Sequence, residues 1–184
     1  ICPPRMVIIP KQINMIVTTS MSPRRLVRVV YMQRKKYYLI VPCVTINELD
    51  YGYSFPITKI GSDTGYGALF DAIVGVMDKD CRMPDSAEAG WVEYTRSPAP
   101  LFDKRAFRKE FGYRYGSLVI YATSIIMMEQ LQDGSFVFEM WSTDGMSKET
   151  MRCPGGSQRE KVIDALAEAL EKSEANRSAR PKYY

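Results

Sequence analysis

The stretch LVRVVYMQRKKYYLIVPCVTI (residues 26–46) decides the fold, because two runs rich in β-branched and aromatic residues flank a short polar segment. Leu26 to Tyr31 and Tyr37 to Ile46 have the composition of strands, and Gln33 to Lys36 has that of a turn. The stretch therefore predicts a β-hairpin with a charged tip. Pro42 has no backbone N–H to donate, so we expect the second strand to be an edge strand, or to bulge, at that position.

The remaining pattern predicts an antiparallel α+β fold. Apolar residues at helical spacing predict a central helix over Ala68 to Met77, with Asp63 or Thr64 as its N-cap. The capping box Ser157-x-x-Glu160 introduces an amphipathic C-terminal helix. Because the strands follow one another in hairpins, we expect one sheet of about five antiparallel strands packed against these two helices.

Two Asp-Gly turns divide the strands of the second half of the chain. Tyr115 to Glu129 is the longest β-branched and apolar stretch, and we expect it to be the central strand. Phe136 to Ser142 is expected to pair with it after the turn at Asp133-Gly134. Three further elements are predicted: a strand at Lys148 to Met151 after Asp144-Gly145, a short helix at Lys104 to Phe111 capped by Asp103, and a surface loop at residues 78–100 with a strand at Trp91 to Tyr94.

Length and composition predict one folded domain. The chain has 184 residues, of which 46% are hydrophobic and 25% are charged, close to the globular average. We expect an extended proline-containing arm at residues 1–23, a single domain at residues 24–175, and a basic tail at residues 176–184. The longest apolar run, Leu118 to Met128, falls well short of the roughly 20 residues that span a membrane. The four cysteines are scattered, which favours reduced thiols and a cytoplasmic compartment.

Positive charge is concentrated at the start of the chain. No acidic residue precedes Glu48, so the first 47 residues carry a net charge of +8 and the rest −4. The first candidate contact region contains Arg24, Arg25, Arg28, Arg34, Lys35 and Lys36, and a second one contains Lys104, Arg105, Arg108, Lys109 and Arg114. Such clusters fit anionic lipid headgroups or nucleic-acid phosphates. A solvated surface that only confers solubility is the alternative.

The sequence selects no catalytic, cofactor or metal site. The complete absence of histidine removes Ser-His-Asp and Cys-His catalysis and most zinc sites. The glycine-rich loop Gly61 to Gly67 matches neither a P-loop nor a dinucleotide fingerprint. Asp78, Asp80 and Asp85 do not have the spacing of an EF-hand. We therefore expect a protein that is not an enzyme and has no small-molecule substrate.

The order of these features resembles that of a rhabdovirus matrix protein of the plant-infecting type. The resemblance rests on the basic proline-containing arm, the charged hairpin, the Tyr51-Gly-Tyr-Ser-Phe and Gly65-Tyr-Gly67 stretches, and Arg-Lys-Glu-Phe-Gly-Tyr-Arg-Tyr-Gly (residues 108–116) before a long apolar stretch. It covers residues 24–175 and includes no signature motif. The Pro-Pro-x-Tyr motif of animal-virus members is absent, since Arg5 and Met6 follow Pro3 and Pro4.

Two functional hypotheses follow. The resemblance implies a peripheral structural protein of the virion and host cytoplasm that self-associates through its arm (Pro3, Pro4, Met6) and bridges a nucleocapsid and an anionic membrane. The alternative is a sequence-tolerant RNA-binding protein or ribonucleoprotein subunit, in which Phe107, Phe111, Tyr113 and Tyr115 stack on bases. The two phenylalanines, four residues apart, are equally expected to face the core of a short amphipathic helix.

Overall fold

The computed structural model describes residues 24–45, 51–53, 56–81, 104–112, 114, 120–142 and 147–179. The expected arm with Pro3, Pro4 and Met6, the strand at residues 91–94, and the turn at Asp144-Gly145 lie outside the described residues. The elements are β1 (Arg25–Met32), η1 (Gln33–Lys35), β2 (Tyr37–Thr45), β3 (Tyr51–Tyr53), β4 (Thr58–Gly61), η2 (Ser62–Thr64), α1 (Gly65–Lys79), α3 (Lys104–Phe111), β5 (Ser124–Gln130), β6 (Phe136–Trp141), β7 (Lys148–Cys153) and α5 (Arg159–Ala179).

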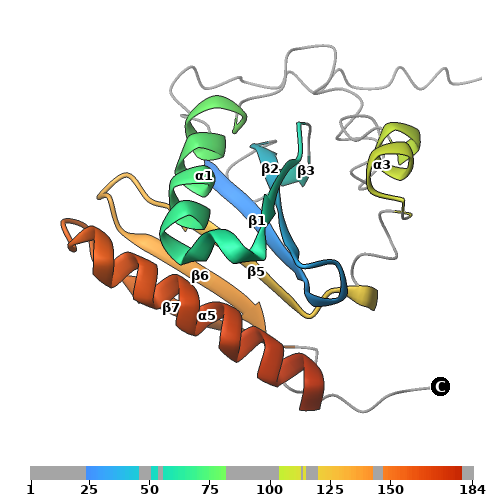
Figure 1. Ribbon diagram of the computed structural model, residues 1–184. Helices are drawn as coiled ribbons and strands as arrows, with labels where there is room; N and C mark the ends of the chain where they lie inside the picture. The colour runs from blue at the N-terminus through green and yellow to red at the C-terminus, as the bar shows by residue number, and fades with distance from the viewer. Residues whose placement is uncertain are drawn as a thin grey trace, which may run out of the picture.

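The fold is α+β, with one antiparallel sheet, a central helix and a C-terminal helix, as the sequence predicts. The sheet has seven strands in the order β3-β2-β1-β5-β6-β7, and β4 also pairs with β2 (Figure 1). The short strands β3 and β4 raise the number above the expected five. Both line the outer side of β2, so β2 is an interior strand.

The predicted hairpin is confirmed. β1 and β2 pair from Val27 opposite Pro42 to Met32 opposite Tyr37, and η1 forms the tip. Lys36 closes the turn in the left-handed region with φ 53°, and its N–H donates to the carbonyl of Gln33 at 3.0 Å. The expectation that β2 is an edge strand at Pro42 holds only locally. In the described residues, β4 pairs as far as Ile40 and β3 starts at Cys43, so Pro42 occupies the gap between them.

Within the described residues, the central strand starts later than predicted; residues 115–119 of the prediction lie outside them. β5 begins at Ser124, and Ile120 and Tyr121 have helical backbone. The reason lies in its neighbour β1, which turns into the hairpin tip directly after Met32. Ser124 faces Tyr31 in the register, and β1 continues for only one residue beyond Tyr31. β5 is nonetheless central, between β1 and β6.

α1 and α5 cover one face of the sheet. Alternate residues of the central strands, among them Val27, Ile126 and Phe138, form the main core with the apolar stripes of both helices. Ser173 fixes α5 to the start of β5, because its hydroxyl donates to the carbonyl of Ile125 at 2.8 Å and accepts its N–H at 3.0 Å. Among the described residues, no helix is long and apolar enough to cross a membrane.

The N-termini of α1 and α5 do not have the side-chain caps that the sequence predicts. Thr64 occupies the N-cap position of α1, but its hydroxyl donates to the carbonyl of Gly61 at 2.7 Å. The capping box at Ser157 is not formed, because α5 begins at Arg159 and Ser157 lies before the N-cap position; its hydroxyl donates to the carbonyl of Pro154 at 2.7 Å. The Gln158 carbonyl accepts the first helical bond of α5, from Val162. α5 then continues through residues 176–179, which the sequence assigns to the tail.

α3 lies on the opposite face of the sheet from α1 and α5 (Figure 1). Its two phenylalanines are buried, Phe107 fully, against apolar residues of β1, β2 and β5. Their ring centroids lie 4.7 Å apart, and the ring planes are tilted by 40°. The interpretation that they pack in the core is therefore confirmed, and a base-stacking role for them is excluded.

Candidate anion-binding surface

The hairpin tip presents three exposed cations. Arg34, Lys35 and Lys36 are all exposed, while Met32 and Tyr37 on either side of them are buried. Met32 and Tyr37 anchor the tip in the apolar core, and the left-handed conformation of Lys36 closes the turn that carries the three basic side chains. Neighbouring like charges on a fixed turn create a local positive potential that an anionic partner relieves.

α3 presents a second group of cations. Arg105, Arg108 and Lys109 are exposed on the side away from Phe107 and Phe111. Glu110 is also exposed, but the three cations outnumber it, so the exposed side of the helix has a net positive charge. Lys104 opens the helix, and Arg114 is exposed shortly after its end. The strongly amphipathic sequence KRAFRKEF produces this division, because residues four apart share a helix face.

The two groups of cations are held by one apolar cluster. Met32 and Tyr37 at the base of the tip belong to the same buried cluster as Phe107 and Phe111 of α3. The cluster lies on the sheet face that α1 and α5 leave uncovered. One apolar cluster thus underlies both regions, which are 68 residues apart between Lys36 and Lys104. We call Arg34, Lys35, Lys36, Arg105, Arg108 and Lys109 the basic surface.

The three arginines at the start of β1 have a different environment. Arg24 makes a bidentate ion pair with Glu129, with both N···O distances 2.7 Å. Arg25 points to the other face of the sheet, where it pairs with Asp78 of α1. The guanidinium of Arg28 stacks over the ring of Tyr53 at 4.0 Å. These contacts join β1 to β5, α1 and β3, so this part of the candidate region also serves the fold.

Hydrogen bonding to Glu129 and partial burial have opposite effects on the pKa of Arg24. Its side chain is 28% exposed and that of Glu129 is 18% exposed. The hydrogen bonds to Glu129 raise the pKa of Arg24 above its usual value, against the opposing effect of burial. The Arg24 guanidinium therefore stays charged, and because it lies against the Glu129 carboxylate it contributes little net positive charge to a contact surface.

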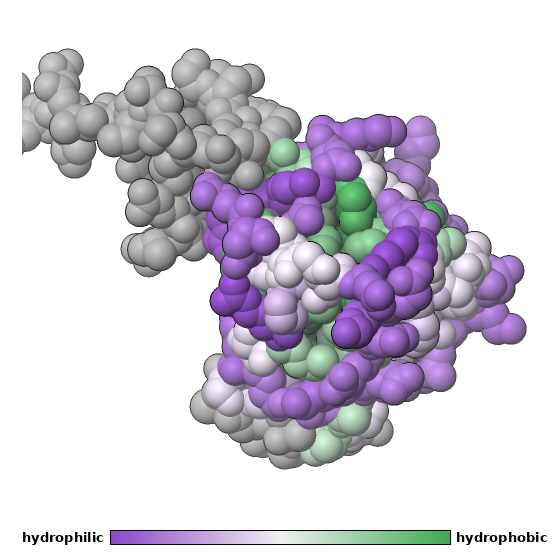
Figure 2. Space-filling view, turned by 90° about the vertical axis from the view of Figure 1, so that its left-hand side faces the viewer, coloured by the Kyte–Doolittle hydropathy of each residue, from purple (hydrophilic) through white to green (hydrophobic). Residues whose placement is uncertain are grey.

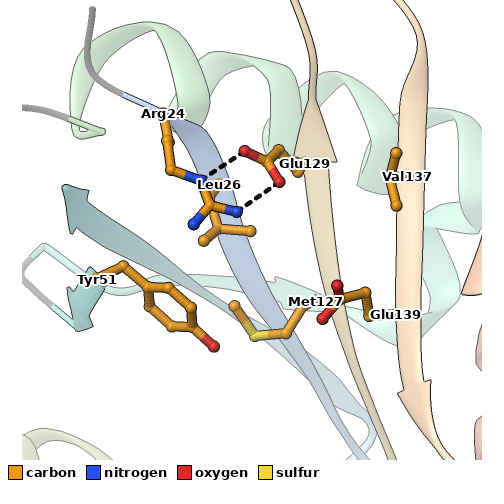
Figure 3. Close-up of a pocket in the computed structure, with 7 residues that line it drawn as sticks. All are labelled: Arg24, Leu26, Tyr51, Met127, Glu129, Val137 and Glu139. Atoms are coloured by element: carbon orange, nitrogen blue, oxygen red, sulfur yellow. Dashed lines mark hydrogen bonds and ion pairs between the residues drawn. The ribbon is translucent and has the colours of Figure 1, made fainter. Parts of the chain in front are cut away.

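A small pocket beside this ion pair was not predicted. Arg24, Leu26, Tyr51, Met127, Glu129, Val137 and Glu139 line it, and Figure 3 shows Tyr51 and Met127 across the pocket from the Arg24–Glu129 pair. Its volume is about 20 Å³, space for about one water molecule. Small-molecule sites are roughly 300–1,000 Å³. The alternating Tyr51-Gly52-Tyr53 was the available sequence signal, since both tyrosines of such a strand share one face.

No protein-family model matches this sequence. No curated protein matches it either. The functional argument therefore rests on the geometry. In the described part of the chain, no group of three or more histidine, cysteine, aspartate or glutamate side chains is placed to hold a metal ion. Cys43 and Cys81 are buried, and burial raises the pKa of both thiols, which disfavours the reactive thiolate.

At the end of the molecule remote from the hairpin tip, arginines pair with carboxylates. There Arg159 at the start of α5 pairs with Asp71 of α1 at 2.7 Å, and Arg152 pairs with Asp133 at 2.6 Å. Figure 2 shows this end, where hydrophilic side chains cover much of the surface and hydrophobic residues are visible between them. The two arginines here are matched by carboxylates.

Removing the carboxylate of the half-buried ion pair tests its structural role. Glu129→Ala is expected to lower the free energy of unfolding by about 1–3 kcal/mol, because it leaves the Arg24 guanidinium without its partner in a poorly solvated position. Chemical denaturation provides the measurement. As a control, the double variant Arg24→Leu/Glu129→Leu should be more stable than Glu129→Ala, because it leaves no charge unpaired. A double variant less stable than the single one would contradict this role.

Proposed function

We propose that this protein is a non-enzymatic structural protein of the viral matrix type, which contacts an anionic partner through its basic surface. The observation that supports this most directly is the shared apolar cluster, which holds the hairpin tip and α3 on one side of the sheet. A rigid presentation of two cation groups suits an extended anionic surface better than a compact ligand, because the charges engage it simultaneously.

The chemistry of the side chains supports a role without catalysis. The sequence contains no histidine, and the described cysteines are buried. The pocket beside Arg24 is far below the size of a substrate site. A binding surface remains the best explanation of the exposed cations.

In this proposal the protein is a homo-oligomer at the cytoplasmic face of a membrane, and part of the virion if it is viral. The basic surface engages anionic lipid, and other copies in the same layer engage the nucleocapsid. The arm residues Pro3, Pro4 and Met6 contact a neighbouring copy. Concentration-dependent, salt-sensitive polymers in analytical ultracentrifugation would support this arrangement, and a monomer at all concentrations would contradict it.

Binding to vesicles tests the basic surface. Each cation near an anionic membrane contributes about 1 kcal/mol, so Arg34→Gln/Lys35→Gln/Lys36→Gln should weaken binding to phosphatidylserine-containing vesicles about 100-fold. Co-sedimentation at increasing salt is the measurement. Arg105→Gln/Arg108→Gln/Lys109→Gln should weaken it to a similar extent, because these cations belong to the same basic surface.

The matched control removes three charges elsewhere. Lys79→Gln/Arg152→Gln/Lys161→Gln has the same net charge as the tip variant, but its substitutions lie away from the hairpin tip. Its vesicle affinity should stay within a few-fold of the wild type, since nearby charges dominate membrane attraction. Equal losses in both triple variants would reduce the effect to net charge. Tight binding to single-stranded RNA without vesicle binding would favour the RNA-binding alternative.

A further inference from the structure

Exposed hydrophobic side chains gather at one end of the sheet. In the described part of the chain, the large hydrophobic residues that are exposed are Ile120 (74%), Tyr121 (58%) and Trp141 (40%). They come from two segments, the turn before β5 and the end of β6. Side chains of this size normally pack inside a protein, so their gathering at one place indicates a contact surface.

The register places the residues before β5 beside the hairpin tip and Trp141 at the same end of the sheet. The Thr123 N–H donates to the carbonyl of Tyr31 at 2.8 Å, and the Gln33 N–H donates to the Thr123 hydroxyl at 3.2 Å. Tyr121 precedes Thr123 by two residues, so its Cα lies within about 7 Å of the Thr123 Cα. Because β5 is antiparallel to both neighbours, the start of β5 lies at the end of β1 and at the end of β6, where Trp141 is.

More cations lie at this end, which we call the tip end. Lys148 opens β7 opposite Trp141, lies 5.8 Å from the centre of its ring and pairs with Glu139 at 2.8 Å. Arg177, in the last turn of α5, donates to the carbonyl of Ala122 at 3.1 Å. Asp63 follows Ser62, whose N–H bonds to Lys36, and brings a negative charge to the same end. The cations at this end (Arg34, Lys35, Lys36, Lys148 and Arg177) outnumber Asp63 and Glu139, so the apolar residues have a basic border.

This combination fits one kind of partner. A lipid interface accepts aliphatic side chains at the acyl boundary, tyrosine and tryptophan at headgroup depth, and lysine and arginine at the phosphates. RNA would engage the cations and the rings but has no use for the aliphatic Ile120. A second copy would bring the same positive charges against these ones, which is unfavourable.

We propose that Ile120, Tyr121 and Trp141 enter the interface of an anionic bilayer while Arg34, Lys35 and Lys36 bind its phosphates. This inference rests on the proposed function and adds to it an orientation, in which the tip end faces the membrane and the sheet stands away from it. It also adds an apolar part of the binding, which salt does not screen.

Trp141 itself is the probe. The chain has two tryptophans, so Trp91→Phe leaves Trp141 as the one tryptophan in the protein. Titration with phosphatidylserine-containing vesicles should move its emission to shorter wavelengths, and lipids brominated near the headgroup should quench it. An emission that is unchanged at vesicle concentrations where the protein co-sediments would overturn the inference.

A second measurement separates the apolar from the ionic contribution. Ile120→Ser/Tyr121→Ser should weaken vesicle partitioning about tenfold or more while leaving the salt dependence as in the wild type, because the apolar transfer is lost and every cation is kept. Near-ultraviolet circular dichroism checks that the variant is folded. Because both side chains are exposed, the fold should be preserved.

The outcomes distinguish the two proposals. If the triple tip variant loses binding but Ile120→Ser/Tyr121→Ser does not, the inference is wrong and the proposed function stands. If the wild-type protein does not bind vesicles at low salt, both are wrong in their membrane part. If the Trp141 emission shifts with protein concentration in the absence of lipid, a second copy covers the tip end and the inference is wrong.

Discussion

Phe107→Ala is expected to lower the free energy of unfolding by about 3–5 kcal/mol, the cost of removing a fully buried aromatic ring. Phe107 is 0% exposed and connects α3 to the sheet face opposite α1 and α5. A helix of eight residues is not stable by itself in water, so α3 depends on this contact. Chemical denaturation, followed by circular dichroism, provides the measurement.

Phe107→Leu is the matched control for this variant. It keeps an apolar side chain of similar size, and should cost markedly less than the alanine variant because the cavity is smaller. Vesicle binding should fall with Phe107→Ala, since Arg105, Arg108 and Lys109 then lose their fixed position. A Phe107→Ala protein with wild-type stability would show that α3 does not pack on the sheet.

The second large effect is expected at Gly155, between β7 and α5. A Cβ at this position would lie 2.0 Å from the backbone carbonyl oxygen of Asp133 and 3.2 Å from the backbone nitrogen of Ser135. Both are backbone atoms of the β5–β6 turn and cannot rotate away. Gly155→Ala should therefore lower the free energy of unfolding by about 3 kcal/mol, at the upper end for overpacking. Thermal and denaturant unfolding measure it.

Gly156 is the neighbouring control. Its φ of +75° disfavours any residue with a side chain, but no atom lies within 4 Å of the Cβ position. Gly156→Ala should therefore cost about 1 kcal/mol, the price of the left-handed conformation alone. If both variants lose equal stability, the close approach between the two turns is not what requires glycine at position 155.

Local pattern was enough to predict most of the elements. The hairpin followed from two β-branched runs around Gln33 to Lys36, and β6 followed from the turn at Asp133-Gly134, where Gly134 indeed has a φ of +76°. These features depend on the conformational preferences of neighbouring residues, which a sequence states directly. The same holds for α1, whose apolar residues recur at helical spacing.

Other features depended on partners distant in the sequence. The start of β5 at Ser124 depends on where β1 ends. The short strands β3 and β4 were missed because three or four residues carry too little pattern, and β2 supplies their pairing. Strands this short form only when the strand that they pair with is in place.

By itself, the sequence determined the antiparallel α+β fold, the charged hairpin tip and the excess of basic residues before Glu48. Only the tertiary structure decided which of those cations face solvent, because ion pairing joins residues far apart in the chain. It gave Arg24 and Arg25 the partners Glu129 and Asp78, and it left Arg34, Lys35 and Lys36 exposed. It also brought Ile120, Tyr121 and Trp141 to the same end, because antiparallel pairing aligns the end of one strand with the start of the next.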